Sequence, residues 1–117
     1  MNAQFKKGVL DLVVMVVVSQ HDIYGYELVK RVCQVVEVNE GTIYPLLKRM
    51  TNEKYFETYL VESTEGPPRK YYRITALGLA TMNELKTEWL AFSKQLNLFL
   101  EGGNHDDEER ISCKIRT

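Results

Sequence analysis

The sequence predicts a mainly α-helical protein that carries one two-stranded β-hairpin and ends in a long helix. Three observations lead to this fold class. Three segments with apolar residues at helical spacing fill the first half of the chain. Two short segments rich in aromatic and β-branched residues follow, separated by a cluster of turn-forming residues. A regular apolar repeat then runs from residue 76 to about residue 100.

The composition is that of one globular domain. The chain has 117 residues, of which 44% are hydrophobic and 26% charged, and its formal net charge is −1. This balance argues against indiscriminate coating of nucleic acid, although a local basic patch remains possible. Its two cysteines, Cys33 and Cys113, make neither a disulfide framework nor a zinc cluster, so we expect no metal or cofactor. No apolar run in the sequence is long enough to span a bilayer, and the sequence shows no n-region, h-region and cleavage site of the secretory kind, so we expect a cytoplasmic protein.

Two helices are expected before the central one. Val9 to Ser19 is mostly Val and Leu, but the run is long for a strand and its apolar residues have helical spacing, so we favour a helix. A polar break follows, in which Asp22 is a candidate cap for the next helix, roughly Tyr24 to Val36. Cys33 lies within the apolar stripe of that helix and is expected to be a small buried hydrophobe.

The third predicted helix follows Asn39, which can cap its first turn, and ends near Glu53-Lys54. Its buried face is an apolar stripe made of Ile43, Leu46, Leu47 and Met50. Its opposite face carries small, flat or cationic residues, namely Gly41, Tyr44, Pro45, Lys48 and Asn52, with Thr42 and Arg49 to one side. Two interpretations stay open. The helix is either an irregular one held by its core stripe, or one whose exposed N-terminal end approaches a partner such as a phosphate.

The two β segments predict a hairpin. Phe56 to Glu62 and Arg69 to Ile74 are the strands, and Ser63 to Pro68 is the turn. The returning strand begins with the basic pair Arg69-Lys70. Three helices followed by such a hairpin is the order of a winged helix-turn-helix domain, which we place at residues 1–75. In that fold the hairpin, or wing, reaches phosphates or the minor groove beside the recognition helix.

The last predicted helix is capped by Thr75 and runs from Ala76 to about Leu100. Its apolar residues recur in alternating steps of three and four, which is a heptad seam and indicates a helical partner. The seam comprises Met82, Leu85, Trp89, Phe92, Leu96 and Phe99. We expect contacts with the chain's own first helix and with a second copy, and we favour a homodimer joined by a dimerisation helix at residues 76–101. Residues 102–117 are expected to form a flexible polar tail.

Four motifs, in this order, resemble the PadR family of bacterial transcriptional regulators. They are Gly8-Val9-Leu10, Tyr24-Gly25-Tyr26-Glu27-Leu28, Glu40-Gly41-Thr42-Ile43-Tyr44-Pro45-Leu46-Leu47 and Arg69-Lys70-Tyr71-Tyr72-Arg73-Ile74-Thr75-Ala76-Leu77-Gly78. The resemblance covers roughly residues 8 to 100 and implies a dimeric winged-helix repressor of the subfamily with a single C-terminal dimerisation helix. The wing tip departs from the family pattern, because Gly66-Pro67-Pro68 replaces a tip of the Gly-Gly-Arg-Arg type and is stiffer and less basic.

The resemblance implies double-stranded DNA as the partner. The candidate DNA-binding residues are Lys6, Tyr24, Asn39, Thr42, Tyr44, Lys48, Arg49, Asn52, Arg69 and Lys70. We expect the five cations among them to contact phosphates, and we expect Thr42, Tyr44 and Asn52 to reach base edges. A two-fold dimer would read an inverted repeat with half-sites about 34 Å apart.

Two questions stay open at this point. Trp89 and Phe92 form either plain dimer core or a flat slot between subunits for a planar aromatic effector. The domain could also bind another protein without specific DNA binding, which the acidic pI and the thin wing favour. An enzyme is not expected, because the sequence has no paired carboxylates at a cleft, no nucleophile–base pair and no phosphate loop.

Overall fold

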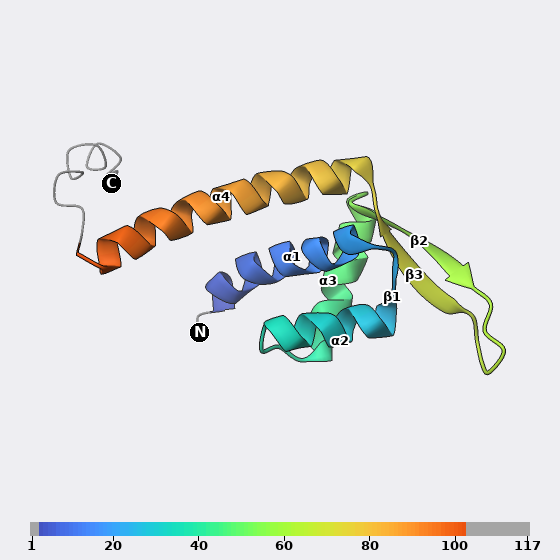
Figure 1. Cartoon of the computed structure of the whole chain (residues 1–117). Coiled ribbons are helices and arrows are strands. Elements are labelled where there is room, and N and C mark those ends of the chain that lie inside the picture. The colour runs from blue at the N-terminus through green and yellow to red at the C-terminus, as the bar shows by residue number, and fades with distance from the viewer. Residues whose placement is uncertain (1–2, 103–117) are drawn as a thin grey trace. The chain divides into compact units, whose positions relative to one another are not determined.

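The computed structural model describes residues 3–102 of the chain, with side chains from residue 8 onward (Figure 1). Within this range the chain forms four helices and three strands in the order α1–β1–α2–α3–β2–β3–α4. The helices are α1 (Ala3–Gln20), α2 (Gly25–Val35), α3 (Glu40–Asn52) and α4 (Ala76–Leu100), and the strands are β1 (Ile23–Tyr24), β2 (Phe56–Val61) and β3 (Arg69–Ile74). The predicted fold class, a mainly helical winged helix-turn-helix with a long C-terminal helix, is confirmed.

The sheet has one strand more than the predicted hairpin. Strands β2 and β3 pair antiparallel from Phe56↔Ile74 to Val61↔Arg69, and β1 adds to the other edge of β3 through Ile23↔Tyr72 and Tyr24↔Tyr71. Strand β1 thus ties the start of α2 directly to the wing. Its two residues are too few to produce an alternating pattern that sequence analysis can detect.

The core lies between the first three helices and the inner face of the sheet. The fully buried large side chains include Met15, Leu28, Ile43, Leu47 and Phe56. The four residues of the predicted α3 stripe are all buried, and Phe56 meets Tyr72 edge-to-face with ring centroids 6.3 Å apart. Because the apolar stripe of α3 is buried in this core, the opposite face of α3 is exposed to solvent.

The two ends of α3 are formed by specific backbone contacts. At its start, Asn39 Oδ1 accepts hydrogen bonds from the Thr42 N–H at 3.2 Å and the Thr42 hydroxyl at 3.3 Å, as the predicted cap requires. At its end, Lys54 adopts a left-handed conformation with φ 72°. The N–H groups of Tyr55 and Lys54 then donate to the carbonyls of Met50 and Thr51, which is a Schellman ending.

The predicted cap of α4 is also present. The Thr75 hydroxyl accepts a hydrogen bond from the Gly78 N–H at 3.0 Å and donates to the Lys54 carbonyl at 2.7 Å. The start of α4 is therefore tied to the end of α3. Gly78 is buried at this junction, and a Cβ there would collide with the carbonyl oxygen of Tyr55.

Two predictions about α2 were wrong. Asp22 does not cap the helix, because the cap position is Tyr24 and the Asp22 carboxylate instead accepts hydrogen bonds from the sheet. Cys33 is exposed rather than buried, and its thiol donates to the Val38 carbonyl at 3.3 Å. It lies at the edge of the buried stripe, where it faces the connection to α3. Helix α1 also begins earlier than expected, at Ala3 instead of Val9.

The chain divides into two compact units, Met1–Leu85 and Lys86–Thr117, so the boundary falls within α4. In the first unit, Met82 is buried in the core and Leu85 packs partly against it. Two of the six predicted seam residues are therefore occupied by the chain's own core. The predicted tail at residues 102–117 lies almost wholly outside the described residues, as does Cys113. None of the described helices could cross a membrane.

Candidate nucleic-acid interface

The exposed face of α3 presents the residues that the sequence assigned to it. Gly41, Tyr44, Pro45, Lys48 and Asn52 are all exposed, and Tyr44 retains 45% of its accessible surface. No ion pair engages Lys48 among the described residues, so its ammonium group is available to an outside anion. A helix with one face in the core and an uncovered tyrosine and lysine on the other can enter a groove.

The N-terminal turn of α3 combines donors with one carboxylate. Asn39 and Thr42 use their side-chain oxygens in the cap, which leaves the Asn39 amide group exposed at the same end. Glu40 lies in this first turn and would repel a phosphate placed directly on the cap. The turn is therefore better suited to base edges than to the DNA backbone.

Arg49 is paired with two carboxylates of the protein itself. Its guanidinium contacts Asp11 of α1 and Glu53 of α3, each at 3.1 Å. The side chain keeps 40% of its surface, but its charge is balanced on both sides. Arg49 therefore braces α3 against α1, and we leave it out of the contacts that we propose below.

The two wing cations point to opposite faces of the sheet. Residues that alternate along a strand face opposite sides, so Lys70 shares the face of buried Tyr72, while Arg69 shares the face of Tyr24. Both cations are exposed. The Arg69 guanidinium lies over the Tyr24 ring, 5.0 Å from its centre. The two cations do not form one basic cluster; they flank the wing.

The start of α2 lies beside Arg69. Tyr24 occupies the cap position, and its side chain makes no hydrogen bond to the N–H groups of the first turn. The neighbouring Arg69 guanidinium is suited to a phosphate, whereas Glu27 in this first turn would repel one placed directly on the helix start.

Asp22 joins the two wing strands. Its carboxylate accepts hydrogen bonds from the Tyr59 hydroxyl at 2.7 Å and from Arg73 Nε at 3.1 Å. The Tyr59 hydrogen bond, together with Arg73, holds the pKa of Asp22 below its ordinary value, and the same hydrogen bond raises the pKa of Tyr59. The cluster is therefore most stable with Asp22 ionised and Tyr59 protonated.

Tyr44 of α3 also acts on the sheet electrostatically. Burial raises the pKa of Tyr72, and the nearby Tyr44 hydroxyl raises it further. The Tyr72 phenol therefore stays protonated at neutral pH.

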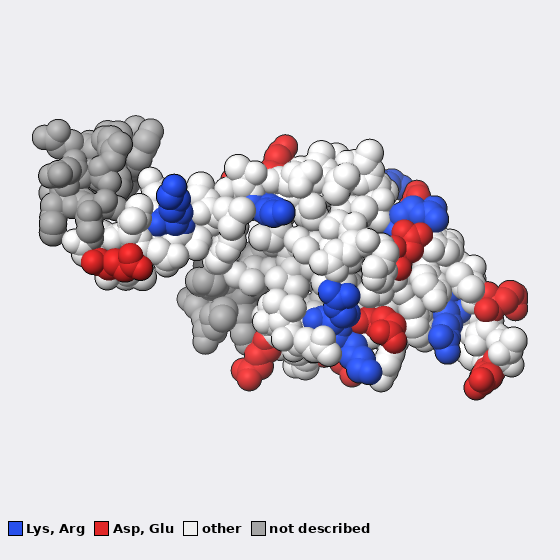
Figure 2. Space-filling model, in the orientation of Figure 1, with Lys and Arg blue, Asp and Glu red and all other residues white. Residues whose placement is uncertain are grey.

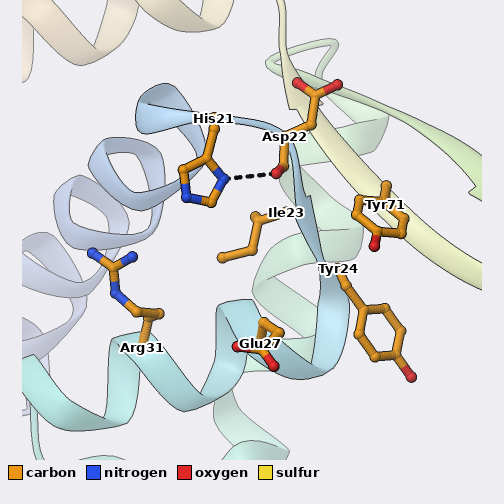
Figure 3. Close-up of a pocket in the computed structure, with 7 residues that line it drawn as sticks. All are labelled: His21, Asp22, Ile23, Tyr24, Glu27, Arg31 and Tyr71. Atoms are coloured by element: carbon orange, nitrogen blue, oxygen red, sulfur yellow. Dashed lines mark hydrogen bonds between the residues drawn. The ribbon is translucent and has the colours of Figure 1, made fainter.

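An open hollow of about 370 Å³ lies where β1 meets α2 (Figure 3). Glu27 and Arg31 of α2 line it together with His21 and Tyr71. His21 Nδ1 donates to the Asp22 carbonyl at 2.8 Å, and Arg31 donates to Gln20 at 2.9 Å. In Figure 3 the Asp22 carboxylate points away from the hollow, toward β3. The charges in the hollow are mixed, so it favours no single class of ligand.

Basic and acidic side chains are interspersed on the face that Figure 2 shows. No broad region of one sign covers this view, which agrees with the net charge of −1. A DNA interface on this protein would thus depend on a few placed cations rather than on a wide positive field.

The second unit carries a set of exposed apolar residues. Trp89, Phe92, Leu96 and Phe99 retain 37%, 54%, 40% and 73% of their surface, and the Trp89 and Phe92 rings lie 6.3 Å apart. Leu90, Leu98 and Leu100 are exposed as well. So much apolar surface on one helix is typical of an interface.

Most of the residues that this geometry brings together were predicted from the sequence, but the contacts of four further residues were not. The contacts among Asp22, Tyr59, Tyr71 and Arg73 form only through sheet pairing, which no local signal in the sequence reveals. Lys6 lies outside the residues whose side chains are described. Among the described residues, no group of three or more His, Cys, Asp or Glu could hold a metal ion.

Comparisons with known proteins identify relatives over most of the chain. The profile of the Transcriptional regulator PadR-like family matches residues 14–84, which is more than half of the sequence. A PadR-like transcriptional regulator from Bacillus cereus superposes with a TM-score of 0.76 at 43% identity, covering 84% of this chain and 97% of that one. A PadR family transcription regulator from Clostridium difficile does so with a TM-score of 0.71 at 34% identity, covering 78% and 97%. An uncharacterized protein of Lysinibacillus sphaericus is 33% identical over 82% of this chain and 92% of its own length.

Proposed function

The chain belongs to the PadR-like family of transcriptional regulators and is therefore a DNA-binding regulator of transcription and not an enzyme, and on this premise we propose that it is a homodimeric repressor of an inverted-repeat operator. A planar aromatic effector would release it from DNA. Because the target is chromosomal DNA and the relatives named above are bacterial, we place the protein in the cytoplasm.

The exposed face of α3 is the observation that carries this proposal. Tyr44, Lys48 and Asn52 lie on one uncovered side of a helix whose other side is locked into the core. We assign α3 to the major groove, with Lys48 on a phosphate and with Asn39, Thr42, Tyr44 and Asn52 near base edges. An exposed Asn can donate to and accept from an adenine in the bidentate manner that reads sequence.

The wing and the start of α2 would contact the DNA backbone on either side of α3. Arg69, which lies over the Tyr24 ring beside the start of α2, makes one phosphate site, and Lys70 on the other face of the wing makes a second. Lys6, near the N-terminus, is a further phosphate contact in this proposal. The tip with Gly66-Pro67-Pro68 supplies no cation, so the affinity of the wing rests on residues of β3.

Dimerisation would duplicate these contacts. The apolar residues Trp89, Phe92, Leu96 and Phe99 of α4 provide a surface that a second copy can cover, and a two-fold axis would present two α3 helices to successive turns of the duplex. Half-sites about 34 Å apart follow from that spacing. Met82 and Leu85 lie against the chain's own core, so the proposed interface is concentrated beyond them.

The effector site would lie between subunits, where two copies of Trp89 and Phe92 bring four aromatic rings together. A flat ligand there would release DNA if it bound more tightly to a dimer whose α3 helices are wrongly spaced. Titration of phenolic acids and planar aromatic drugs, followed by Trp89 fluorescence, tests this part. If no compound quenches the Trp89 fluorescence, the aromatic cluster belongs to the dimer core and is not an effector site.

Selection of bound duplexes from a random DNA pool tests the main proposal. We expect enrichment of an inverted repeat, and we expect Asn52→Ala to relax the preference at defined positions of each half-site. The alternative function, a protein-binding winged helix, is favoured by the exposed Leu60 and Val61 on the wing. It would be supported if no sequence is enriched and the protein does not bind random DNA even at low salt.

A further inference from the structure

Three tyrosines form a continuous row across the outer face of the sheet. Tyr24 of β1 pairs with Tyr71 of β3, which pairs with Tyr59 of β2. Directly paired residues point to the same face, so the three rings lie next to one another. The Tyr24 and Tyr71 ring centres are 5.9 Å apart, and those of Tyr71 and Tyr59 are 5.6 Å apart with the rings nearly parallel at 18°.

An arginine covers each end of this row. The Arg73 guanidinium lies 4.8 Å from the centre of the Tyr59 ring, and the Arg69 guanidinium lies 5.0 Å from the centre of the Tyr24 ring. Both distances are within the range of cation–π contacts. The row is thus Arg73–Tyr59–Tyr71–Tyr24–Arg69, and it crosses all three strands.

The two arginines differ in their partners. Arg73 is neutralised, because it contacts Asp22 at 3.1 Å and Glu57 at 3.6 Å. Arg69 makes no ion pair with any described carboxylate, and its described interaction is with the Tyr24 ring. No acceptor among the described residues takes a hydrogen bond from the Arg69 guanidinium, so Arg69 can still donate to an anion.

The Arg73 end is also fixed to the helix-turn-helix. Asp22 accepts from Tyr59 and Arg73, and it immediately precedes β1 and the start of α2. The Arg69 end lies beside the first turn of the same helix, through Tyr24. The row therefore joins both strands of the wing to α2.

We propose that Tyr24, Tyr71 and Tyr59 are positioning residues that hold the Arg69 guanidinium in the orientation in which it contacts a DNA phosphate. This inference rests on the proposed DNA-binding function and deepens it. A free arginine side chain loses rotamer entropy when it binds, and a side chain that is already restrained loses less. The tyrosines thus contribute to affinity through Arg69, whether or not they touch DNA.

A double-mutant cycle on the full chain tests the proposal. The variants are Tyr24→Leu, Tyr24→Phe, Arg69→Ala and the Tyr24→Leu/Arg69→Ala pair. The probe is a labelled random-sequence duplex of roughly 30 base pairs at low salt, because phosphate contacts do not require the operator. Affinity, its salt dependence and the melting temperature are measured for each variant.

We expect Arg69→Ala to weaken binding by about three- to tenfold and Tyr24→Leu by about two- to fivefold, with a reduced salt slope in both. Tyr24→Phe keeps the ring and should bind within about twofold of the wild type. In the Arg69→Ala background, Tyr24→Leu should have no further effect, because the residue that it positions is already absent.

Three outcomes would overturn the proposal. Equal losses from Tyr24→Leu in both backgrounds would mean that Tyr24 acts independently of Arg69. A loss in Tyr24→Phe as large as in Tyr24→Leu would assign the effect to the hydroxyl. An unchanged salt slope with a lower melting temperature would mean that the tyrosine row contributes only to the stability of the fold. If Tyr24→Leu does not fold, Tyr71→Leu and Tyr71→Phe take its place in the same cycle.

The failure of the inference differs from that of the proposed function. A wild-type protein that binds no duplex at low salt contradicts DNA binding itself. A wild-type protein that binds, combined with independent effects in the cycle, contradicts only the role of the tyrosine row.

Discussion

At the scale of single residues, the charged side chains separate into those balanced within the protein and those left for a partner. Arg49 and Arg73 each contact two carboxylates, whereas Lys48, Arg69 and Lys70 have no ion pair among the described residues. A cation that is already paired gains little from a phosphate, since it must exchange one anion for another. The unpaired cations are therefore the ones that should determine the salt dependence of DNA binding.

Lys48→Ala tests this division directly. The change should weaken binding to all duplexes to a similar degree and lower the slope of log affinity against log salt by about 0.9 for each lost phosphate contact. Fluorescence anisotropy at several salt concentrations measures it. Lys86→Ala is the matched control, because it removes the same charge from an exposed position on α4 and should leave the slope unchanged. An unaltered slope in Lys48→Ala would remove this residue from the phosphate contacts.

Asp22 predicts a pH dependence of stability. Its folded pKa is lowered from 3.8, first by the Tyr59 hydrogen bond and then by Arg73. A group with a lowered pKa stabilises the fold above its unfolded pKa, and this contribution disappears as the pH falls through the folded value. Asp22→Asn should therefore be less stable than the wild type at neutral pH, and the difference should shrink as the pH falls below about 4.

Urea unfolding between roughly pH 2 and pH 7 measures that difference. Tyr59→Phe is the comparison variant, since it keeps the carboxylate and removes the hydrogen bond that contributes most to the lowered pKa. In Tyr59→Phe, the loss of stability on acidification should begin nearer the ordinary pKa of an aspartate. A difference between wild type and Asp22→Asn that does not change with pH would mean that the carboxylate is not the stabilising form.

At the scale of elements, local signals in the sequence were enough to predict the helix boundaries that depend on caps. Asn39 and Thr75 were recognised because a cap is a contact between residues three apart. Contacts between distant residues were not predictable. The ion pair between Asp11 and Arg49 spans 38 positions, and the pairing of β1 with β3 exists only once the sheet has formed. Cys33 was misplaced because helical spacing alone does not define the edge of a buried stripe.

The junction of α3 and α4 should be intolerant of added volume at one glycine. In Gly78→Ala the new Cβ would meet the Tyr55 carbonyl oxygen and, at 2.8 Å, the side chain of Ile74. Because the obstructing oxygen belongs to the backbone, the two elements must move apart, and we expect a loss of about 1–3 kcal/mol of folding free energy. Gly8→Ala is the control, since nothing lies within 4 Å of its Cβ and α1 should gain about 0.5–1 kcal/mol. Equal stability of the two variants in urea unfolding would contradict the packing described here.

At the scale of the whole molecule, the apolar residues of the long helix divide between two roles. The heptad pattern predicts one stripe of apolar residues, but it did not reveal where along the stripe the chain's own core ends. Met82 is buried and Leu85 is partly covered, whereas Leu96 and Phe99 remain exposed. Core packing and the proposed dimer contact can share one repeat because both need an apolar residue once every three or four positions.

The exposed part of that stripe predicts a dimer that a single introduced carboxylate would dissociate. Leu96→Glu would bury a charge without a partner at the interface, and we expect roughly 100-fold weaker association or more. Ala91→Glu adds the same charge to the opposite side of α4 and should remain dimeric. Sedimentation equilibrium distinguishes a 13.6 kDa chain from a species of twice that mass. Because the proposed operator binding would need two α3 helices on one duplex, the Leu96→Glu monomer should lose its preference for an inverted repeat and keep weak, salt-sensitive binding to any DNA. A wild-type protein that is already monomeric, or a Leu96→Glu variant that still selects an inverted repeat, would contradict the proposal that two chains assemble through α4 to read the operator.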